Sequence, residues 1–305
     1  MICQCRSCRL NSRLQGEFLA VMIRRNKQTR AWVALIGFAL LVVSMYPSVN
    51  VSANQVTNIC TDEIKVMPLG DSITTGKYSG HDTSESVPED DIGYRKDLWE
   101  LLNAAGFSVD FVGTQSNGST YPFSDPEHEG HNGFTDTQIT DNIYNAPGGE
   151  NWLSQNHADV ITLHIGTNFL DNDPSDVERI LDEIDEYETD TGKRVIVILA
   201  RIIDMVPNNP VVNQFNNKVE EMAKARTDYG IDLFMVDMED GAGINYSIWD
   251  QDLNPNGDMI DPLHPYATGY TKMASVWMAA FDDLCQEIYL PLVYKNFTGK
   301  KYLWD

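Results

Sequence analysis

Basic residues are scarce in this sequence. Its 305 residues include 22 Lys and Arg against 45 Asp and Glu, which gives a formal net charge of −23. Proteins bind nucleic acid or anionic membranes through clustered cations, because these neutralise phosphate groups. The acidic balance therefore predicts that the protein does not bind nucleic acid. It also predicts that the protein does not bind a membrane once any targeting segment is removed.

Long apolar runs are also rare, and the one present is short for a membrane span. It covers residues 31–45, whereas a transmembrane helix needs about 20 apolar residues. Four basic residues between positions 24 and 30 precede it, and residues 51–53 (VSA) resemble a cleavage site. This order predicts a secretory signal within residues 1–53 and an extracellular protein. An uncleaved anchor is the alternative, and Met22 is an alternative start.

Cysteine is nearly absent from the chain beyond this segment. Cys3, Cys5 and Cys8 lie before the apolar run, which leaves Cys60 and Cys285. In an oxidising compartment, two cysteines near opposite ends of a domain favour one disulfide. Two buried free thiols are the alternative.

Internal repeats and low-complexity linkers are absent, which indicates one domain over residues 54–290. Apolar runs of strand length occur at 64–69, 108–113, 159–165, 195–203 and 231–238. Helical patterns occur at 94–105, 136–144, 174–192, 211–229 and 267–289. Unbroken apolar strands separated by helices are typical of a parallel sheet covered on both faces. We therefore predict a three-layer α/β/α sandwich with a five-stranded parallel sheet, followed by a tail of unassigned role at 291–305.

A serine directly follows the first predicted strand. In an open α/β sheet, functional loops follow the carboxyl ends of the strands, which is where Gly70, Asp71 and Ser72 fall. The triplet alone is a weak signal, because these residue types are also common in turns and helix caps. The segment lacks the Gly-x-Ser-x-Gly motif, which disfavours the α/β-hydrolase fold.

Two further motifs fall at later junctions. Asn168 follows the strand at 159–165, and its amide can donate to a developing oxyanion, with a turn-forming Asn as the alternative. Asp261 and His264 lie three residues apart before the last predicted helix. This spacing suits a carboxylate that fixes the imidazole tautomer and stabilises its charged form, with an incidental histidine as the alternative. Together with the preceding serine, these residues predict a serine hydrolase site.

Two segments invite a metal-site interpretation. Residues 128–131 (HEGH) lack the H-E-x-x-H spacing, and Gly130 disfavours a helix there, so a loop at the active-site entrance is preferred to zinc. Residues 252–257 begin like a calcium loop, but the twelfth position is Leu263 rather than Glu. An acidic turn is therefore preferred to calcium, and we expect neither a metal nor a cofactor.

Four blocks of this sequence resemble the signatures of the SGNH, or GDSL-type, hydrolase superfamily. They are residues 70–72, Gly133, residues 166–168 and residues 261–264. The closer resemblance is to carbohydrate esterase family three, which contains acetyl xylan esterases, and it extends over about residues 64–284. The strings that carry it are MPLGDSITTG (67–76), GYRKDLW (93–99), VDFVGTQ (109–115), HEGHNGFTDTQI (128–139), LHIGTN (163–168) and DPLHPYATGYTKMA (261–274). The likeness implies the flavodoxin-like α/β/α fold of that superfamily.

The resemblance also implies a role for each matching residue. Ser72 matches the nucleophile, His264 the base and Asp261 its partner. The implied oxyanion donors are the backbone N–H groups of Ser72 and Gly133 and the side-chain amide of Asn168. The family usually has Asp at the next position, where this chain has Phe169, and we expect this change to alter the pocket wall rather than the chemistry.

We therefore predict a secreted, monomeric serine esterase that removes O-acetyl groups from xylan-type polysaccharide. The alternatives are a lipid or thioester hydrolase of the same fold and a non-catalytic carbohydrate-binding protein at the cell surface. The loops at 77–92 and 114–134 are polar, which favours a shallow acetyl pocket over the apolar channel that long acyl chains need.

Overall fold

The computed structural model describes residues 58, 60–78, 89–227 and 232–289. The predicted signal at 1–53 and the tail at 291–305 lie outside the described residues.

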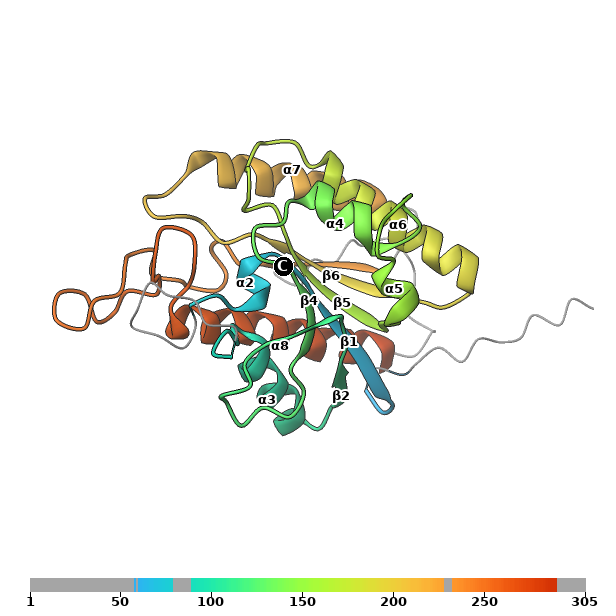
Figure 1. Cartoon of the computed structure of the whole chain (residues 1–305), viewed down its shortest axis with the longest axis horizontal. Helices are drawn as coiled ribbons and strands as arrows, with labels where there is room; N and C mark the ends of the chain where they lie inside the picture. Colours follow the sequence, from blue (N-terminus) through green and yellow to red (C-terminus); the bar gives the residue numbers. More distant parts are fainter. Residues whose placement is uncertain (1–57, 59, 79–88, 228–231, 290–305) are drawn as a thin grey trace, which may run out of the picture. The chain divides into compact units, whose positions relative to one another are not determined.

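A parallel sheet forms the centre of the described structure (Figure 1). Its five main strands are β1 (Glu63–Gly70), β2 (Ser108–Phe111), β5 (Val160–His164), β6 (Ile196–Arg201) and β7 (Leu233–Asp237). β1 pairs in parallel with β2 on one side and with β5 on the other, and β6 and β7 follow beyond β5. This is the strand order of flavodoxin-like sheets, which place their sites beyond the carboxyl ends of the strands. The predicted fold class is confirmed.

Two short strands add to the five predicted ones. β4 (Glu127–Gly130) pairs in parallel with Leu69 and Gly70, beyond the end of β2, and β3 (Gln115–Ser116) pairs antiparallel with β4. The sequence predicts a loop at 128–131, and this prediction is wrong for most of the segment. Backbone pairing with β1, rather than burial of an apolar face, holds β4 in place. The residues of β4 therefore need not alternate between apolar and polar, and the sequence pattern does not reveal the strand.

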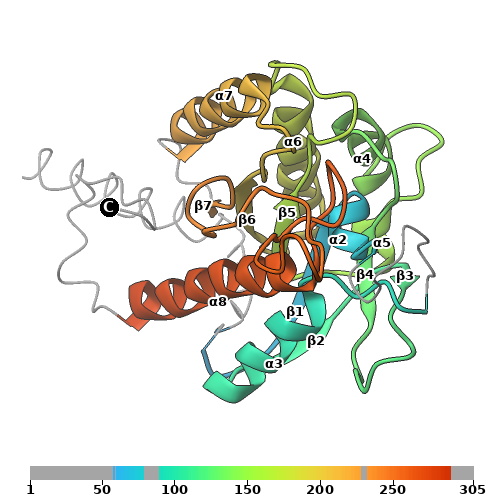
Figure 2. The same ribbon diagram turned by 90° about the vertical axis from the view of Figure 1, so that its left-hand side faces the viewer.

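Helices cover both faces of the sheet (Figure 2). One face carries α3 (Arg95–Ala105) and α8 (Ala267–Tyr289). The other carries α4 (Asp136–Ile143), α5 (Trp152–Gln155), α6 (Ser175–Thr191) and α7 (Pro210–Thr227). The remaining helix, α2 (Ser72–Thr75), is a single turn that begins where β1 ends.

Successive residues of each strand contribute to opposite cores. In β6, Ile196 and Ile198 belong to the core with Trp277 of α8, whereas Val197 and Leu199 belong to the core on the other face. All of these side chains are buried. Burial on both faces explains why the strands are unbroken apolar runs in the sequence.

A disulfide joins Cys60 to Cys285, as predicted. It links the segment before β1 to α8, across 225 residues of sequence. None of the helices that the structure describes combines the length and apolar character needed to cross a membrane.

Removal of this disulfide should lower stability. A covalent link across so long a loop restricts the unfolded chain, and loss of a native disulfide typically costs about 2–5 kcal/mol. We expect Cys60→Ser/Cys285→Ser to lower the free energy of unfolding in urea by about 3–5 kcal/mol. Reduction of the wild type should have a similar effect, and reduction of the double variant none. A wild-type midpoint insensitive to reductant would contradict the assignment.

Candidate functional site

Ser72 lies at the carboxyl end of β1, where the chain turns without a linker into α2. Asp71 caps this turn, because its Oδ1 accepts the backbone N–H of Ile73 at 2.9 Å. A Cβ on Gly70 would lie 2.2 Å from the carbonyl oxygen of His164, so only glycine fits at that position. The tight turn places Ser72 in a nearly buried position, with 7% of its surface exposed.

Three of the predicted site residues form one hydrogen-bonded chain. Ser72 Oγ lies 2.9 Å from Nε2 of His264, which is 192 residues away in sequence. Nδ1 of His264 lies 2.8 Å from Oδ2 of Asp261. A hydroxyl bonded to an imidazole, with a carboxylate on the far nitrogen, is the geometry that allows the imidazole to take the hydroxyl proton.

The backbone around Asp261 holds its carboxylate in place. Oδ1 accepts the N–H groups of Leu263 and His264 at 2.7 and 2.8 Å, and the carbonyl of Pro262 accepts the N–H of Val206. Partial burial raises the pKa of Asp261, but the bonds from His264 and from the backbone outweigh this effect and bring the pKa below its usual value. The carboxylate is therefore charged at neutral pH and able to stabilise a protonated imidazole.

The predicted oxyanion segments are joined to each other. Gly133 has a φ of 79°, in the left-handed region, within a turn closed by the N–H of Phe134 and the carbonyl of His131. The carbonyl of Phe134 accepts a hydrogen bond from Nδ2 of Asn168 at 2.9 Å. A side-chain amide carries two N–H donors, so Asn168 can hold this turn with one and retain the other for a ligand.

Phe169, for which the resemblance leads us to expect Asp, projects into solvent. Its surface is 91% exposed and its φ is 53°. A bulky residue with positive φ is uncommon and marks local strain. With Asn168 it borders a small cavity of about 60 Å³.

Arg95 holds α2 in place through hydrogen bonds to its carbonyl groups, a role that the sequence does not reveal. Its fully buried guanidinium donates four hydrogen bonds of 2.9 to 3.1 Å to backbone carbonyls. The acceptors are the carbonyls of Thr74, Thr75, Asp91 and Pro126. Burial lowers the pKa of Arg95 to about 10, which leaves it charged at neutral pH. In the sequence, Arg95 is marked only by its place in the string at 93–99. An arginine at the start of a helix is usually exposed to solvent, so the sequence does not indicate that this one is buried.

Tyr78 was also missed by the sequence, which indicates only a polar loop there. Its ring meets the ring of His264 edge to face, with centroids 5.2 Å apart. It therefore borders the imidazole from the side of the loop that follows α2.

Two buried ionisable groups lie beneath the site. Burial raises the pKa of Asp71 to about 6 and lowers the pKa of His164, at the end of β5, to about 4. Nε2 of His164 accepts the backbone N–H of Ile203 at 3.2 Å, so its imidazole is neutral at neutral pH. The charge on Asp71 therefore changes with pH near this raised pKa.

The segment that invited a zinc interpretation is occupied by other interactions. His128 bonds to Asn117 and to the N–H of Gly130, while His131 bonds to Glu129 and stacks on Trp152. In the part of the chain that the structure describes, no cluster of three or more His, Cys, Asp or Glu side chains is arranged to hold a metal ion.

Comparison with known proteins identifies relatives over most of the described domain. Residues 66–277 match the family model of GDSL-like lipases/acylhydrolases. A "multidomain esterase" of Ruminococcus flavefaciens is 28% identical in an alignment of 242 positions that covers 70% of this chain and 28% of that protein. The chain thus spans about a quarter of the length of this curated relative.

Solved structures agree with this match. A Clostridium thermocellum family 3 carbohydrate esterase shares 29% identity at a TM-score of 0.57, over 74% of this chain and 99% of that one. A family 3 carbohydrate esterase from Talaromyces cellulolyticus shares the fold, with a TM-score of 0.53 and 24% identity over 73% of this chain and 99% of that one.

Replacement of Arg95 should disturb both stability and the placement of α2. Arg95→Lys keeps the charge but loses the planar fork, so buried carbonyls lose their partners at about 1–3 kcal/mol each. We expect the free energy of unfolding to fall by about 3 kcal/mol and the ester hydrolysis rate constant, kcat, to fall about tenfold, since small displacements of a nucleophile are costly. Arg179→Lys, at an exposed helix position, is the control and should change neither quantity measurably. Equal behaviour of the two variants would contradict the supporting role.

The buried carboxyl of Asp71 predicts a pH-dependent stability change. Its folded pKa of about 6 lies above the usual 3.8, so stability falls as pH rises through this window, by about 3 kcal/mol when complete. Asp71→Asn retains the acceptor for Ile73. We therefore expect it to raise the free energy of unfolding above about pH 7 by up to that amount, and to have little effect below about pH 4. Urea titrations at both pH values test this, with exposed Asp282→Asn as control. A gain of equal size at both would show that ionisation is not its cause.

Proposed function

The chain belongs to the GDSL-like lipase/acylhydrolase family of carboxylic ester hydrolases, and we propose that it is a secreted acetylesterase acting on O-acetylated polysaccharide. The observation that carries this proposal is the hydrogen-bonded chain from Ser72 through His264 to Asp261. No cofactor takes part in the proposed reaction.

In the proposed mechanism, Ser72 Oγ attacks the acetyl carbonyl carbon while His264 Nε2 takes the hydroxyl proton. The charge on Asp261 stabilises the imidazolium that forms. As the tetrahedral intermediate collapses, His264 gives this proton to the departing sugar oxygen, and the acetyl group stays on Ser72. A water then attacks the acyl-enzyme, with its proton passing to His264 and from there to the Ser72 oxygen as acetate leaves.

The developing oxyanion needs donors at the same end of the sheet. The N–H of Ser72 is at the N-terminus of α2, where the backbone N–H groups have no intrahelical partner. We propose the N–H of Gly133 and the free amide hydrogen of Asn168 as the other two donors. One such donor is typically worth about 10²–10³ in kcat.

A carbohydrate ester as substrate is supported by the relatives and by the composition. The solved structure at 29% identity is described as a family 3 carbohydrate esterase, and the sequence relative as a multidomain esterase. The acidic surface suits an uncharged substrate such as acetylated xylan better than a polyanion. Secretion is supported by the signal-like pattern within residues 1–53 and by the disulfide, since disulfides persist in oxidising compartments. We propose that the protein acts as a monomer.

Replacement of the nucleophile tests the catalytic assignment. Ser72→Ala removes the attacking oxygen, so we expect kcat for 4-nitrophenyl acetate and for acetylated xylan to fall at least about 10⁴-fold. Ser275→Ala, on the exposed side of α8, is the matched control and should retain wild-type rates. Retention of activity by the Ser72 variant would overturn the mechanism. Faster hydrolysis of an octanoyl than of an acetyl ester by the wild type would instead favour a lipid substrate.

A further inference from the structure

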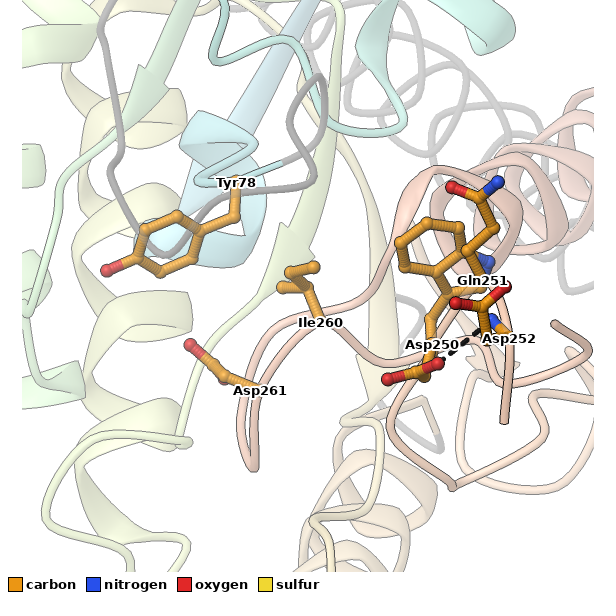
Figure 3. Close-up of a pocket in the computed structure, with 7 residues that line it drawn as sticks. Tyr78, Asp250, Gln251, Asp252, Ile260 and Asp261 are labelled. Atoms are coloured by element: carbon orange, nitrogen blue, oxygen red, sulfur yellow. Dashed lines mark hydrogen bonds between the residues drawn. The ribbon is translucent and has the colours of Figure 1, made fainter. Parts of the chain in front are cut away.

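A cavity of about 450 Å³ lies beside the catalytic histidine–aspartate pair (Figure 3). Figure 3 shows Tyr78 on one side of Ile260 and the segment 250–252 on the other, with Asp261 near Tyr78. The volume falls in the range of about 300–1,000 Å³ that is typical of small-molecule sites. We propose that this cavity binds the saccharide chain that carries the acetyl ester, and that it selects uncharged sugars over sugars bearing carboxylates. This inference rests on the proposed function.

Two aromatic residues line the cavity, and aromatic rings suit the C–H faces of a sugar ring. Tyr78 packs against His264, which places one wall directly beside the reacting groups. Trp249 also lines the cavity, and its ring stacks on Tyr266 with centroids 4.3 Å apart and planes 13° apart. The stacking immobilises Trp249 before any ligand arrives, which reduces the entropy lost on binding.

The polar lining consists of acceptors and an amide. Asp250, Asp252 and Asp261 contribute carboxylates, and Gln251 contributes its amide. Carboxylates can accept hydrogen bonds from the hydroxyl groups that surround a sugar ring. Oδ1 of Asp250 accepts the N–H groups of Asp252 and Leu253 at 2.9 and 2.8 Å, which holds this loop in one conformation.

The same carboxylates define the selectivity. Among the residues that the structure describes, those lining the cavity include three acidic side chains and no Lys, Arg or His. A uronic acid placed there would bring a further negative charge close to them. Asp250 and Asp252 are exposed, so this repulsion acts through solvent and is strongest at low salt. Neutral acetylated sugars avoid this repulsion, so the cavity should favour an acetylated backbone that carries no carboxylate.

The position of the cavity also explains how binding would direct the chemistry. Asp261 belongs both to the cavity lining and to the chain that leads to Ser72. A saccharide held between Tyr78 and Trp249 would therefore lie beside the nucleophile, so that an acetyl group near one end of the bound segment reaches Ser72.

The first test compares a polymeric substrate with a small ester. For each variant, kcat/KM is measured for neutral acetylated xylo-oligosaccharide and for 4-nitrophenyl acetate, and their ratio is reported. Trp249→Ala should lower this ratio about tenfold, through loss of an aromatic contact made by the saccharide, and Trp249→Phe should restore most of it. Leu101→Ala, an exposed position on α3, is the control and should leave the ratio unchanged. A ratio equal to that of the control would overturn the proposal.

The second test addresses charge. Asp252 is exposed at the cavity, and Asp252→Lys should raise kcat/KM for acetylated oligosaccharides bearing a uronate, relative to neutral ones, about fivefold at low salt. The gain should shrink as salt is added. The control, Asp282→Lys, makes the same change in net charge. Asp282 lies about 22 Å along α8 from Ala267, the first residue of that helix, so this variant should leave the relative rates unchanged. Equal gains in both variants would show that net charge, rather than the cavity, sets the preference, and would overturn the proposed selectivity.

Failure of the proposed function has a different signature. If wild type hydrolyses 4-nitrophenyl acetate in a manner that depends on Ser72 but no acetylated saccharide, the esterase chemistry stands and both the saccharide substrate and this cavity's role are wrong. If wild type turns over the saccharides but the Trp249 and Asp252 variants behave like their controls, the proposed function stands and only this inference is wrong.

Discussion

The position of Ser72 depends on close backbone packing at the carboxyl end of β1. There Gly70 pairs with Gly130 of β4 on one side and with His164 of β5 on the other. A side chain on Gly130 would lie 2.6 Å from the backbone nitrogen of Thr75, and one on Gly70 would meet the carbonyl of His164. Two glycines therefore allow β1, β4, β5 and α2 to meet at one point, and the turn into Ser72 follows from that contact.

This close packing leaves polar groups in the interior, and each has to be satisfied locally. Arg95 meets four carbonyls with its planar donors, and His164 accepts a backbone N–H as a neutral ring. Asp71 is less well compensated, because its Oδ2 has no hydrogen-bond partner while its Oδ1 caps α2. Burial without a full set of hydrogen bonds disfavours the charged carboxylate, and this raises the pKa of Asp71. The serine is thus held by a support that sacrifices some stability, which is common where a site needs rigid geometry.

The sequence predicts the five main strands and the helices between them well, because those segments are buried by their own side chains. Gly106 and Gly192 end α3 and α6 in left-handed conformations, as is common for glycine at a helix C-terminus. β4 escapes prediction because its stability comes from pairing with β1, and pairing partners are not encoded in local pattern. Arg95 and Tyr78 escape for a related reason, since their importance comes from contacts with residues distant in sequence. By contrast, Asp261 and His264 are close in the chain, so their spacing alone indicates a pair.

In the proposed function, the chemistry and the choice of substrate are assigned to separate parts of the fold. Ser72 follows a central strand, and the segment from Asp261 to His264 is pinned by backbone bonds to its own carboxylate and to Val206. The cavity wall from Trp249 to Asp252 belongs instead to a surface loop, which is held by its own turn, by stacking on Tyr266 and by a hydrogen bond from the N–H of Trp249 to the carbonyl of Met259. Substitutions in this loop can change charge and shape without moving the strand ends. The constraint on Gly70 and Gly130 allows no such freedom, so substrate preference should vary among related chains more readily than the placement of the serine.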